Sequence, residues 1–209
     1  MTNVLIVEDQ AMPRQLFEMF VSQSGRYHLV ASIVNADMAE YYCRQTQIDL
    51  VLMDICTAMG ASGLEAAEII KAKHPHIRVI LVTSMPEYSY LERARAIGVD
   101  SFWYKEFSRE PILELMDRTM AGDSVFPDTT PEIRFGKASS FDLSDRELEI
   151  LRELTSGDTN TEIAERLGIS TGTVKTHIQH MLEKTGFKSR TELAVKARET
   201  GLVIRDGQM

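Results

Sequence analysis

The first 120 or so residues alternate short, continuous apolar runs with longer stretches in which apolar residues recur at helical spacing. Continuous apolar runs predict strands covered on both faces of a sheet, because a strand with one solvent face would alternate. The predicted strands are 4–7, 29–34, 50–53, 79–82 and 99–104, and the predicted helices are 12–23, 37–47, 64–74, 88–97 and 109–121. Five βα units with short connections predict a parallel, right-handed, doubly wound α/β domain over residues 1–122.

This pattern stops after Gly122. Residues 123–142 contain Pro127, Pro131 and Gly136 and lack sustained periodicity, so we expect them to link two domains. From residue 143 onward the pattern is helical throughout. The chain from 143 to 209 therefore predicts a second, all-α domain, which at roughly 65 residues is small but able to fold alone.

The helix boundaries in this second domain carry recognisable caps. Ser144 and Glu147 have the spacing of a capping box, and Gly157 is expected to end the helix that they start. A short helix is predicted over 161–167, with Gly168 as its stop, and Ser170 caps a longer one over 171–185. A last helix is predicted over 190–200. The residues expected to form the core are Ile163, Ala164, Leu167, Ile169, Val174, Ile178 and Leu182.

Composition narrows the class of protein. With 44% hydrophobic and 26% charged residues, the chain is of ordinary globular type. It has no apolar run near the roughly 18 residues that a membrane span needs and no signal-like start, so we expect a cytoplasmic protein without membrane contact. Cys43 and Cys56 have neither metal-site nor disulfide spacing and are expected to be free thiols.

Charge is unevenly distributed along the chain. The formal net charge is -8, which alone would disfavour nucleic acid as a partner. Residues 170–190 nevertheless hold four basic residues and one acidic residue, together with His177 and His180. An acidic chain thus carries one locally basic helical segment, which is where contact with nucleic acid is expected.

Polar residues follow four of the predicted strands. They are Glu8 and Asp9, Asp54, Thr83, and Lys105. Since ligands bind beyond the carboxyl ends of parallel strands, we expect these side chains to meet in one crevice. Clustered carboxylates repel unless a cation lies among them, and an all-oxygen donor set favours Mg²⁺. A carboxylate, Mg²⁺, a lysine and a hydroxyl together suit formation of an acyl phosphate, with the carboxylate as nucleophile.

On these residues the segment 1–122 resembles the receiver domain of bacterial two-component response regulators, whose fold is flavodoxin-like and five-stranded. The resemblance implies that Asp54 is the phosphoacceptor and that Thr83 and Lys105 contact the phosphoryl group. It implies Mg²⁺ ligation by Asp9, Asp54 and the main-chain carbonyl of Cys56, with Glu8 acting through water. Phe102, three residues before the lysine, corresponds to the switch aromatic.

The loop after Asp54 departs from the family's pattern. Receivers usually have Met-Pro at the third and fourth positions after the acceptor and Gly at the eighth, where this chain has Thr57, Ala58 and Ser62, with Gly63 at the ninth. One residue is inserted, and Gly60 and Gly63 supply backbone freedom for a remade turn. Cys56 and Met85 occupy positions that influence hydrolysis in the family. Neither can position water strongly, so we expect a persistent phosphoryl group.

The basic segment lies within the elements of a helix-turn-helix. Residues 143–200 are similar to the LuxR-type DNA-binding domain, matching at Leu143-Ser144-x-Arg146-Glu147, Asn160-x-Glu162-Ile163-Ala164 and Thr173-Val174-Lys175-x-His177. By position, Lys175, Thr176 and Gln179 are expected to contact bases. Phosphate or supporting contacts are expected from Thr171, Thr173, His177, His180 and Lys184.

Together the two resemblances imply a NarL/FixJ-type transcription regulator. A partner histidine kinase is expected to phosphorylate Asp54. Phosphorylation is expected to favour a homodimer that binds promoter DNA. One alternative is an aspartate-nucleophile phosphatase, but that enzyme would need a second acid where this chain has Cys56. Another is a regulator whose receiver is inert to phosphorylation, which the altered loop leaves open.

Overall fold

The computed structural model describes residues 1–203. The predicted second domain was drawn to residue 209, and its last part, 204–209, lies outside the described residues. The described chain divides into two compact units. One comprises Met1–Ser84 and Ser89–Thr129, and the other comprises Met85–Tyr88 and the chain from Thr130 onward.

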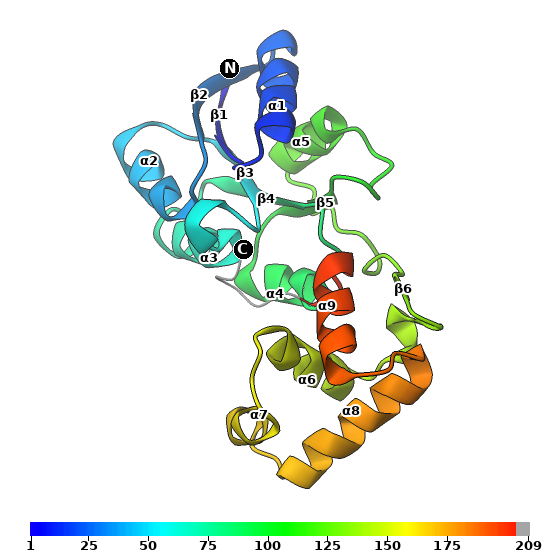
Figure 1. The fold of residues 1–209 in the computed structure, drawn as a ribbon. Helices are drawn as coiled ribbons and strands as arrows, with labels where there is room; N and C mark the ends of the chain where they lie inside the picture. The colour runs from blue at the N-terminus through cyan, green and yellow to red at the C-terminus, as the bar shows by residue number, and fades with distance from the viewer. Residues whose placement is uncertain (204–209) are drawn as a thin grey trace. The chain divides into compact units, whose positions relative to one another are not determined.

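The first unit is a five-stranded parallel sheet with helices on both faces (Figure 1). Its strands are β1 Thr2–Val7, β2 Tyr27–Ile33, β3 Leu50–Asp54, β4 Arg78–Thr83 and β5 Ser101–Tyr104, and its α-helices are α1 Ala11–Gln23, α2 Ala39–Gln45, α3 Gly63–Lys73, α4 Tyr90–Ile97 and α5 Ile112–Ala121. The order β2-β1-β3-β4-β5 places β1 and β3 at the centre, where the strand order reverses. The predicted doubly wound α/β fold is confirmed.

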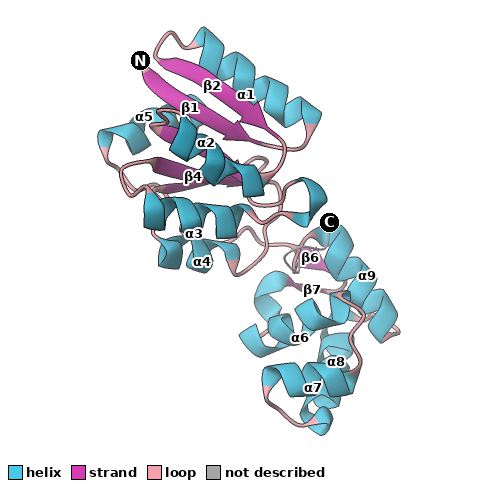
Figure 2. Cartoon of the chain, turned by 90° about the vertical axis from the view of Figure 1, so that its left-hand side faces the viewer, coloured by secondary structure: helices cyan, strands magenta, loops and turns pink. Residues whose placement is uncertain are grey.

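The two faces of the sheet are covered by different helices (Figure 2). On one face α1 and α5 pack against alternate strand residues, among them Ile6, Leu52 and Val82. The residues between them in sequence point to the opposite face, which α2, α3 and α4 cover. Since both faces are buried, β3 is buried along its whole length, which accounts for its unbroken apolar run.

Several predicted boundaries were wrong by a few residues, each for a local reason. The helix expected at 109–121 begins only at Ile112, after Pro111, whose backbone is extended. Glu110 precedes this proline, and the residue before a proline is disfavoured in helical backbone. The helix expected at 37–47 is divided into a 3₁₀ turn, Ala36–Met38, and α2. The strand expected at 99–104 begins at Ser101. Asp100, the residue before it, directs its carboxylate toward Val79 of β4.

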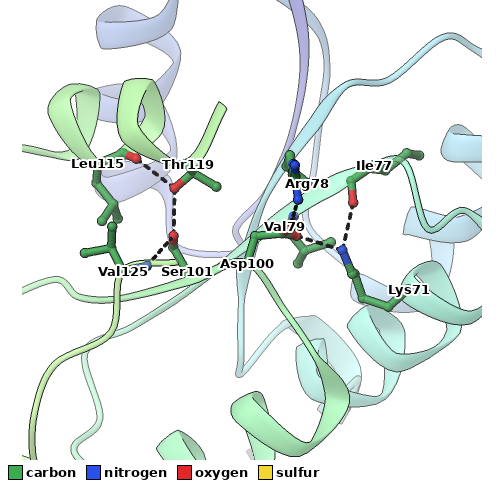
Figure 3. A network of polar contacts seen from close by, with 9 residues as sticks. All are labelled: Lys71, Ile77, Arg78, Val79, Asp100, Ser101, Leu115, Thr119 and Val125. Carbon is green, nitrogen blue, oxygen red and sulfur yellow. Dashed lines mark hydrogen bonds and ion pairs between the residues drawn. The ribbon is translucent and has the colours of Figure 1, made fainter. Parts of the chain in front are cut away.

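Asp100 anchors the amino-terminal end of β5 (Figure 3). Its carboxylate accepts hydrogen bonds from the main-chain N–H of Val79 at 2.8 Å, from Lys71 Nζ at 2.8 Å and from the Arg78 guanidinium at 2.6 Å. These contacts fix β5 against β4 at the amino-terminal ends of the strands, away from the acidic residues at the carboxyl ends. They support the fold and take no part in the acidic cluster.

The described part of the second unit contains four α-helices and a small hairpin. They are β6 Arg134–Phe135, β7 Ala138–Ser139, α6 Asp145–Thr155, α7 Asn160–Leu167, α8 Thr171–Thr185 and α9 Arg190–Thr200. The predicted capping box of Ser144 and Glu147 is confirmed, as is Ser170 as the N-cap of α8. The expected core residues are buried or packed against the core, with Ile163 and Val174 fully enclosed.

Residues 123–142, predicted from composition to link two domains, have local structure of their own. Val125 pairs with Ser101 in a one-residue parallel bridge beside β5. The hairpin of β6 and β7 and a 3₁₀ turn, Ser140–Asp142, follow further along the segment. Among residues 1–203, no helix combines the length and apolar character needed to cross a membrane.

Candidate functional site

Three carboxylates gather at the carboxyl end of the sheet. Glu8 and Asp9 follow β1 and Asp54 is the last residue of β3, and because β1 and β3 are neighbours these strand ends lie together. One carboxylate oxygen from each residue lies within 4.8 Å of the others. Glu8 is fully buried, Asp54 is 4% exposed, and the buried Oδ1 of Asp9 has no hydrogen-bond partner. The three carboxylates that were predicted to meet at these strand ends therefore do lie together.

Lys105 supplies the one basic side chain that contacts these carboxylates in the described residues. Its Nζ lies 2.6 Å from Oε2 of Glu8 and 3.0 Å from Oδ2 of Asp54. The main-chain N–H of Lys105 donates to the carbonyl of Thr83 at 2.8 Å, so the register of β4 and β5 holds the lysine at this edge. Three carboxylates facing one ammonium leave an excess of negative charge in a poorly solvated space.

That excess has a direct effect on the ionisation of Asp54. Burial raises the pKa of its carboxyl to about 7, the Lys105 ammonium opposes the rise, and Glu8 and Asp9 add to it. Burial works to lower the pKa of Lys105, but the carboxylates of Asp54 and Glu8 outweigh it, so that pKa lies above its ordinary value. Lys105 therefore remains charged at neutral pH, while Asp54 is poised between its two forms.

The donor set fits a hard divalent cation. Carboxylate oxygens are the ligands that Mg²⁺ prefers, and Asp9 presents a buried oxygen that no protein group satisfies. A second positive charge would also relieve the repulsion that raises the pKa of Asp54. Glu8, Asp9 and Asp54 could therefore hold such an ion.

Arg14 of α1 organises this site, although sequence reasoning gave it no role. Its guanidinium donates to the main-chain carbonyls of both Glu8 and Asp9, each at 3.0 Å. It thereby fixes the backbone from which the two carboxylates project, while the Glu8 side chain accepts from the N–H of Gln10 at 3.1 Å. An arginine five residues after the second acid of an acidic pair is the signal that could have identified it.

The loop after Asp54 accommodates its extra residue with a left-handed turn. Met59 and Gly60 have φ of 62° and 74°, and Met59 is the one non-glycine residue with positive φ in the described chain. Gly63 lies so close to the end of β3 that a Cβ there would sit 2.0 Å from the Asp54 carbonyl oxygen. Gly60 thus contributes a left-handed backbone conformation to this turn, and Gly63 allows the close approach of two backbone segments.

Thr83 and Phe102 are placed on one face of the sheet. Thr83 ends β4 and is 1% exposed, and it pairs with Tyr104 of β5 just as Leu81 pairs with Phe102. Residues paired in this way project to the same side, so both aromatic rings share the face on which Thr83 lies. Cys56, two residues after Asp54, places its Sγ 3.4 Å from the hydroxyl of Tyr90 at the start of α4.

The second candidate site is the exposed face of α8. Lys175, Thr176 and Gln179 all project to solvent at successive turns of the helix. Thr176 donates to the carbonyl of Gly172, and Gln179 to the carboxylate of Glu183. In the described residues the Lys175 ammonium forms no ion pair. Three side chains able to donate to bases or phosphates thus share one accessible face.

The other residues predicted for nucleic-acid contact are placed less uniformly. Thr171 is half-buried, and Thr173 is exposed but takes part in the N-cap of α8 with Ser170. His180 is exposed, whereas His177 is half-buried.

Lys184 is committed to the domain's own packing. Its Nζ lies 2.7 Å from Oε2 of Glu147 and 3.0 Å from the Asp142 carbonyl. Glu147 is the nearly buried acid of the α6 capping box, so Lys184 neutralises a charge that the fold needs. Burial favours a higher pKa for Glu147, but the lysine and Ser144 outweigh it and hold that pKa below its usual range.

Two protein-family models match different parts of the chain. Residues 4–117 match the model of the response regulator receiver domain, and residues 142–197 match that of the bacterial regulatory proteins of the LuxR family. The chain is also similar to the response regulator protein VraR of Staphylococcus aureus, with 32% identity over 206 residues, covering 96% of this chain and 98% of VraR.

Two solved structures are similar in fold to this chain. A DNA-binding response regulator of the LuxR family from Staphylococcus aureus covers 57% of this chain and 99% of its own, with 31% identity and a TM-score of 0.53. RcsB of Salmonella enterica serovar Typhimurium, bound to a promoter in the presence of phosphomimetic BeF₃⁻, covers 94% and 98%, with 18% identity and a TM-score of 0.60. At that identity, RcsB supports the fold alone.

The pKa of Asp54 provides a direct test of the first site. In metal-free protein its carboxyl carbon should titrate near pH 7 in an NMR experiment on ¹³C-labelled aspartate. Lys105→Met removes the attracting ammonium, so the pKa should rise further, whereas Lys175→Met in the other unit should leave it unchanged. A pKa near the ordinary value of 3.8 in the wild type would contradict the account.

The two lysines of α8 should separate binding from stability. Lys175→Ala should weaken specific DNA binding by about 1–3 kcal/mol if the lysine contacts a base, and should leave the free energy of unfolding unchanged. Lys184→Ala should lower that free energy by about 1–2 kcal/mol, because it leaves the Glu147 carboxylate without its cation. Binding isotherms and urea denaturation measure the two effects. An equal loss with unrelated DNA would assign Lys175 to phosphate, and an unstable Lys175→Ala would contradict the division of roles.

Proposed function

The chain belongs to the response regulators of the LuxR family, and from that membership we propose which of its residues carry the function. It is a two-component response regulator, in which phosphorylation of an aspartate by a partner histidine kinase switches DNA binding and transcription. We assign residues 1–122 to the receiver, 123–142 to the linker and 143–209 to the DNA-binding domain.

Asp54 is the phosphoacceptor in this proposal. Its carboxylate attacks the phosphorus of the kinase's phosphohistidine, forming an oxygen–phosphorus bond as the nitrogen–phosphorus bond breaks. The observation that carries the assignment is its burial beside Glu8, Asp9 and Lys105. The two acids could hold a cation, and Lys105 supplies a positive charge, so the charge of the incoming group would be neutralised. Ionised Asp54 is the nucleophile, and Lys105 favours that form.

Mg²⁺ would be held by Asp9, Asp54 and the main-chain carbonyl of Cys56, with Glu8 acting through water. When bound, it neutralises the acidic cluster and the phosphoryl oxygens. Thr83 moves toward the acceptor and donates a hydrogen bond from its hydroxyl to the phosphoryl group. Lys105 exchanges its contact with Asp54 for one with a phosphoryl oxygen. Phe102 and α4 then repack into the space that Thr83 has left.

The second domain binds double-stranded promoter DNA through α8. We propose base contacts from Lys175, Thr176 and Gln179 and supporting contacts from Thr171, Thr173, His177 and His180. Lys184, given its pairing with Glu147, would contact phosphate only as a secondary role. RcsB, to which the chain is similar, has been solved as two dimers bound to DNA, and we propose that this chain also dimerises on paired half-sites, in the cytoplasm.

We propose that the chain is a regulator and does not turn over an outside substrate. An aspartate-nucleophile phosphatase would use an acid two residues after its nucleophile. Here that residue is Cys56, whose thiol contacts Tyr90 and is a weak proton donor beside a carboxylate. Because a thiol at this position also cannot position water strongly, hydrolysis of the phosphoryl group should be slow.

Phosphorylation of the isolated protein tests the assignment. Incubated with acetyl phosphate and Mg²⁺, the wild type should gain the mass of one phosphoryl group by intact-protein mass spectrometry. Asp54→Asn should gain none, whereas Asp123→Asn, an aspartate in an exposed ion pair, should behave as the wild type. If neither the wild type nor Asp54→Asn gains mass, the receiver is inert and the altered loop at 57–62 is the first place to look. Rapid loss of the label would contradict the expected persistence.

A further inference from the structure

The chain that leaves α5 turns back and lies along the outer edge of β5. The N–H of Phe102 donates to the carbonyl of Val125 at 2.9 Å, and the N–H of Val125 donates to Oγ of Ser101 at 3.2 Å. Ser101 in turn donates to Thr119, whose hydroxyl donates to the Leu115 carbonyl (Figure 3). The outer edge of β5 therefore gains a partner from the segment 125–127.

Phe126 and Pro127 continue this contact onto α4. The Phe126 ring lies 6.3 Å from that of Phe102, and the Arg95 guanidinium lies 5.2 Å above the Phe126 ring. Arg95 also donates to the Pro127 carbonyl at 3.1 Å. Phe102 is 1% exposed, and the Phe126 ring is its aromatic neighbour on this surface. The segment 125–127 is thus held by backbone, aromatic and cationic contacts on one surface of β5 and α4.

This surface is adjacent to the phosphorylation site through one layer of side chains. Thr83 pairs with Tyr104, and the Tyr104 ring lies 4.9 Å from that of Phe102 on the same face of the sheet. A movement of Thr83 toward Asp54 would vacate volume beside these rings. A packed interior does not tolerate an empty volume, so Phe102 would move inward and lose its contact with Phe126.

From these contacts we propose that the surface formed by Arg95, Ser101 and Phe102 is a docking site for the chain's own segment 125–127, and that phosphorylation releases the segment. The inference rests on the proposed role of Asp54. The released segment leads directly to Thr130, where the longer part of the second unit begins, so its release lengthens the free chain at this connection. Because coupling is reciprocal, weakening the docked segment strengthens binding of a phosphoryl group.

Amide exchange in the full-length protein tests the release. The Phe102 N–H is held by Val125, whereas the Asp100 N–H is held by the Val79 carbonyl of β4. Saturation with phosphomimetic BeF₃⁻ and Mg²⁺ should increase exchange at Phe102 about tenfold, as expected when one backbone hydrogen bond is lost, and leave Asp100 unchanged. In Asp54→Asn neither amide should respond.

Equilibrium binding tests the reciprocal effect. Phe126→Ala should bind BeF₃⁻ at least about fivefold more tightly than the wild type, whereas Phe141→Ala, which truncates an exposed phenylalanine elsewhere, should not differ. Protection of the Asp100 amide in Phe126→Ala shows that the sheet is intact. Binding of BeF₃⁻ with unchanged exchange at Phe102 and unchanged affinity in Phe126→Ala overturns the coupling alone. Failure of the wild type to bind BeF₃⁻ overturns the role of Asp54 and the coupling with it.

Discussion

The receiver is organised around an electrostatic imbalance that its fold creates. Parallel strands deliver Glu8, Asp9 and Asp54 to one poorly solvated edge, where Lys105 alone among the described residues offsets them. Such a cluster costs stability, and the raised pKa of Asp54 is the sign of that cost. In the proposed function, a bound cation would neutralise this excess charge, and a phosphoryl group would take Lys105 from Asp54 as its partner.

Other residues of the first unit hold that arrangement in place. Arg14 fixes the backbone of the acidic pair, and Gly63 permits the close return of the chain beneath Asp54. Asp100 anchors β5 at the far edge, so that movement near Phe102 need not disturb the sheet. In α8 of the second unit, Lys184 pairs with Glu147 of its own domain, whereas Lys175 is exposed to solvent.

Much of this was predictable because it depends on local pattern. Continuous apolar runs gave the strands, and polar residues at their ends gave the acidic cluster, since topology alone brings carboxyl ends together. A capping box gave the start of α6, and Ser170 as an N-cap residue gave the start of α8. Contacts between residues distant in sequence could not be found in this way. Three-dimensional packing brings Lys184 to Glu147 and Phe126 to Phe102. The left-handed conformation of Met59 results from an inserted residue, and the local sequence does not reveal the geometry of that insertion.

The central claim is that excess negative charge at Glu8, Asp9 and Asp54 creates a site for one divalent cation. Calorimetric titration of Mg²⁺ into the full-length protein tests it most directly. The account predicts one ion per chain, affinity that falls as the pH is lowered below about 7 and Asp54 becomes protonated, and loss of binding in Asp9→Asn. Binding that is the same in Asp9→Asn, or that does not change with pH, would contradict it.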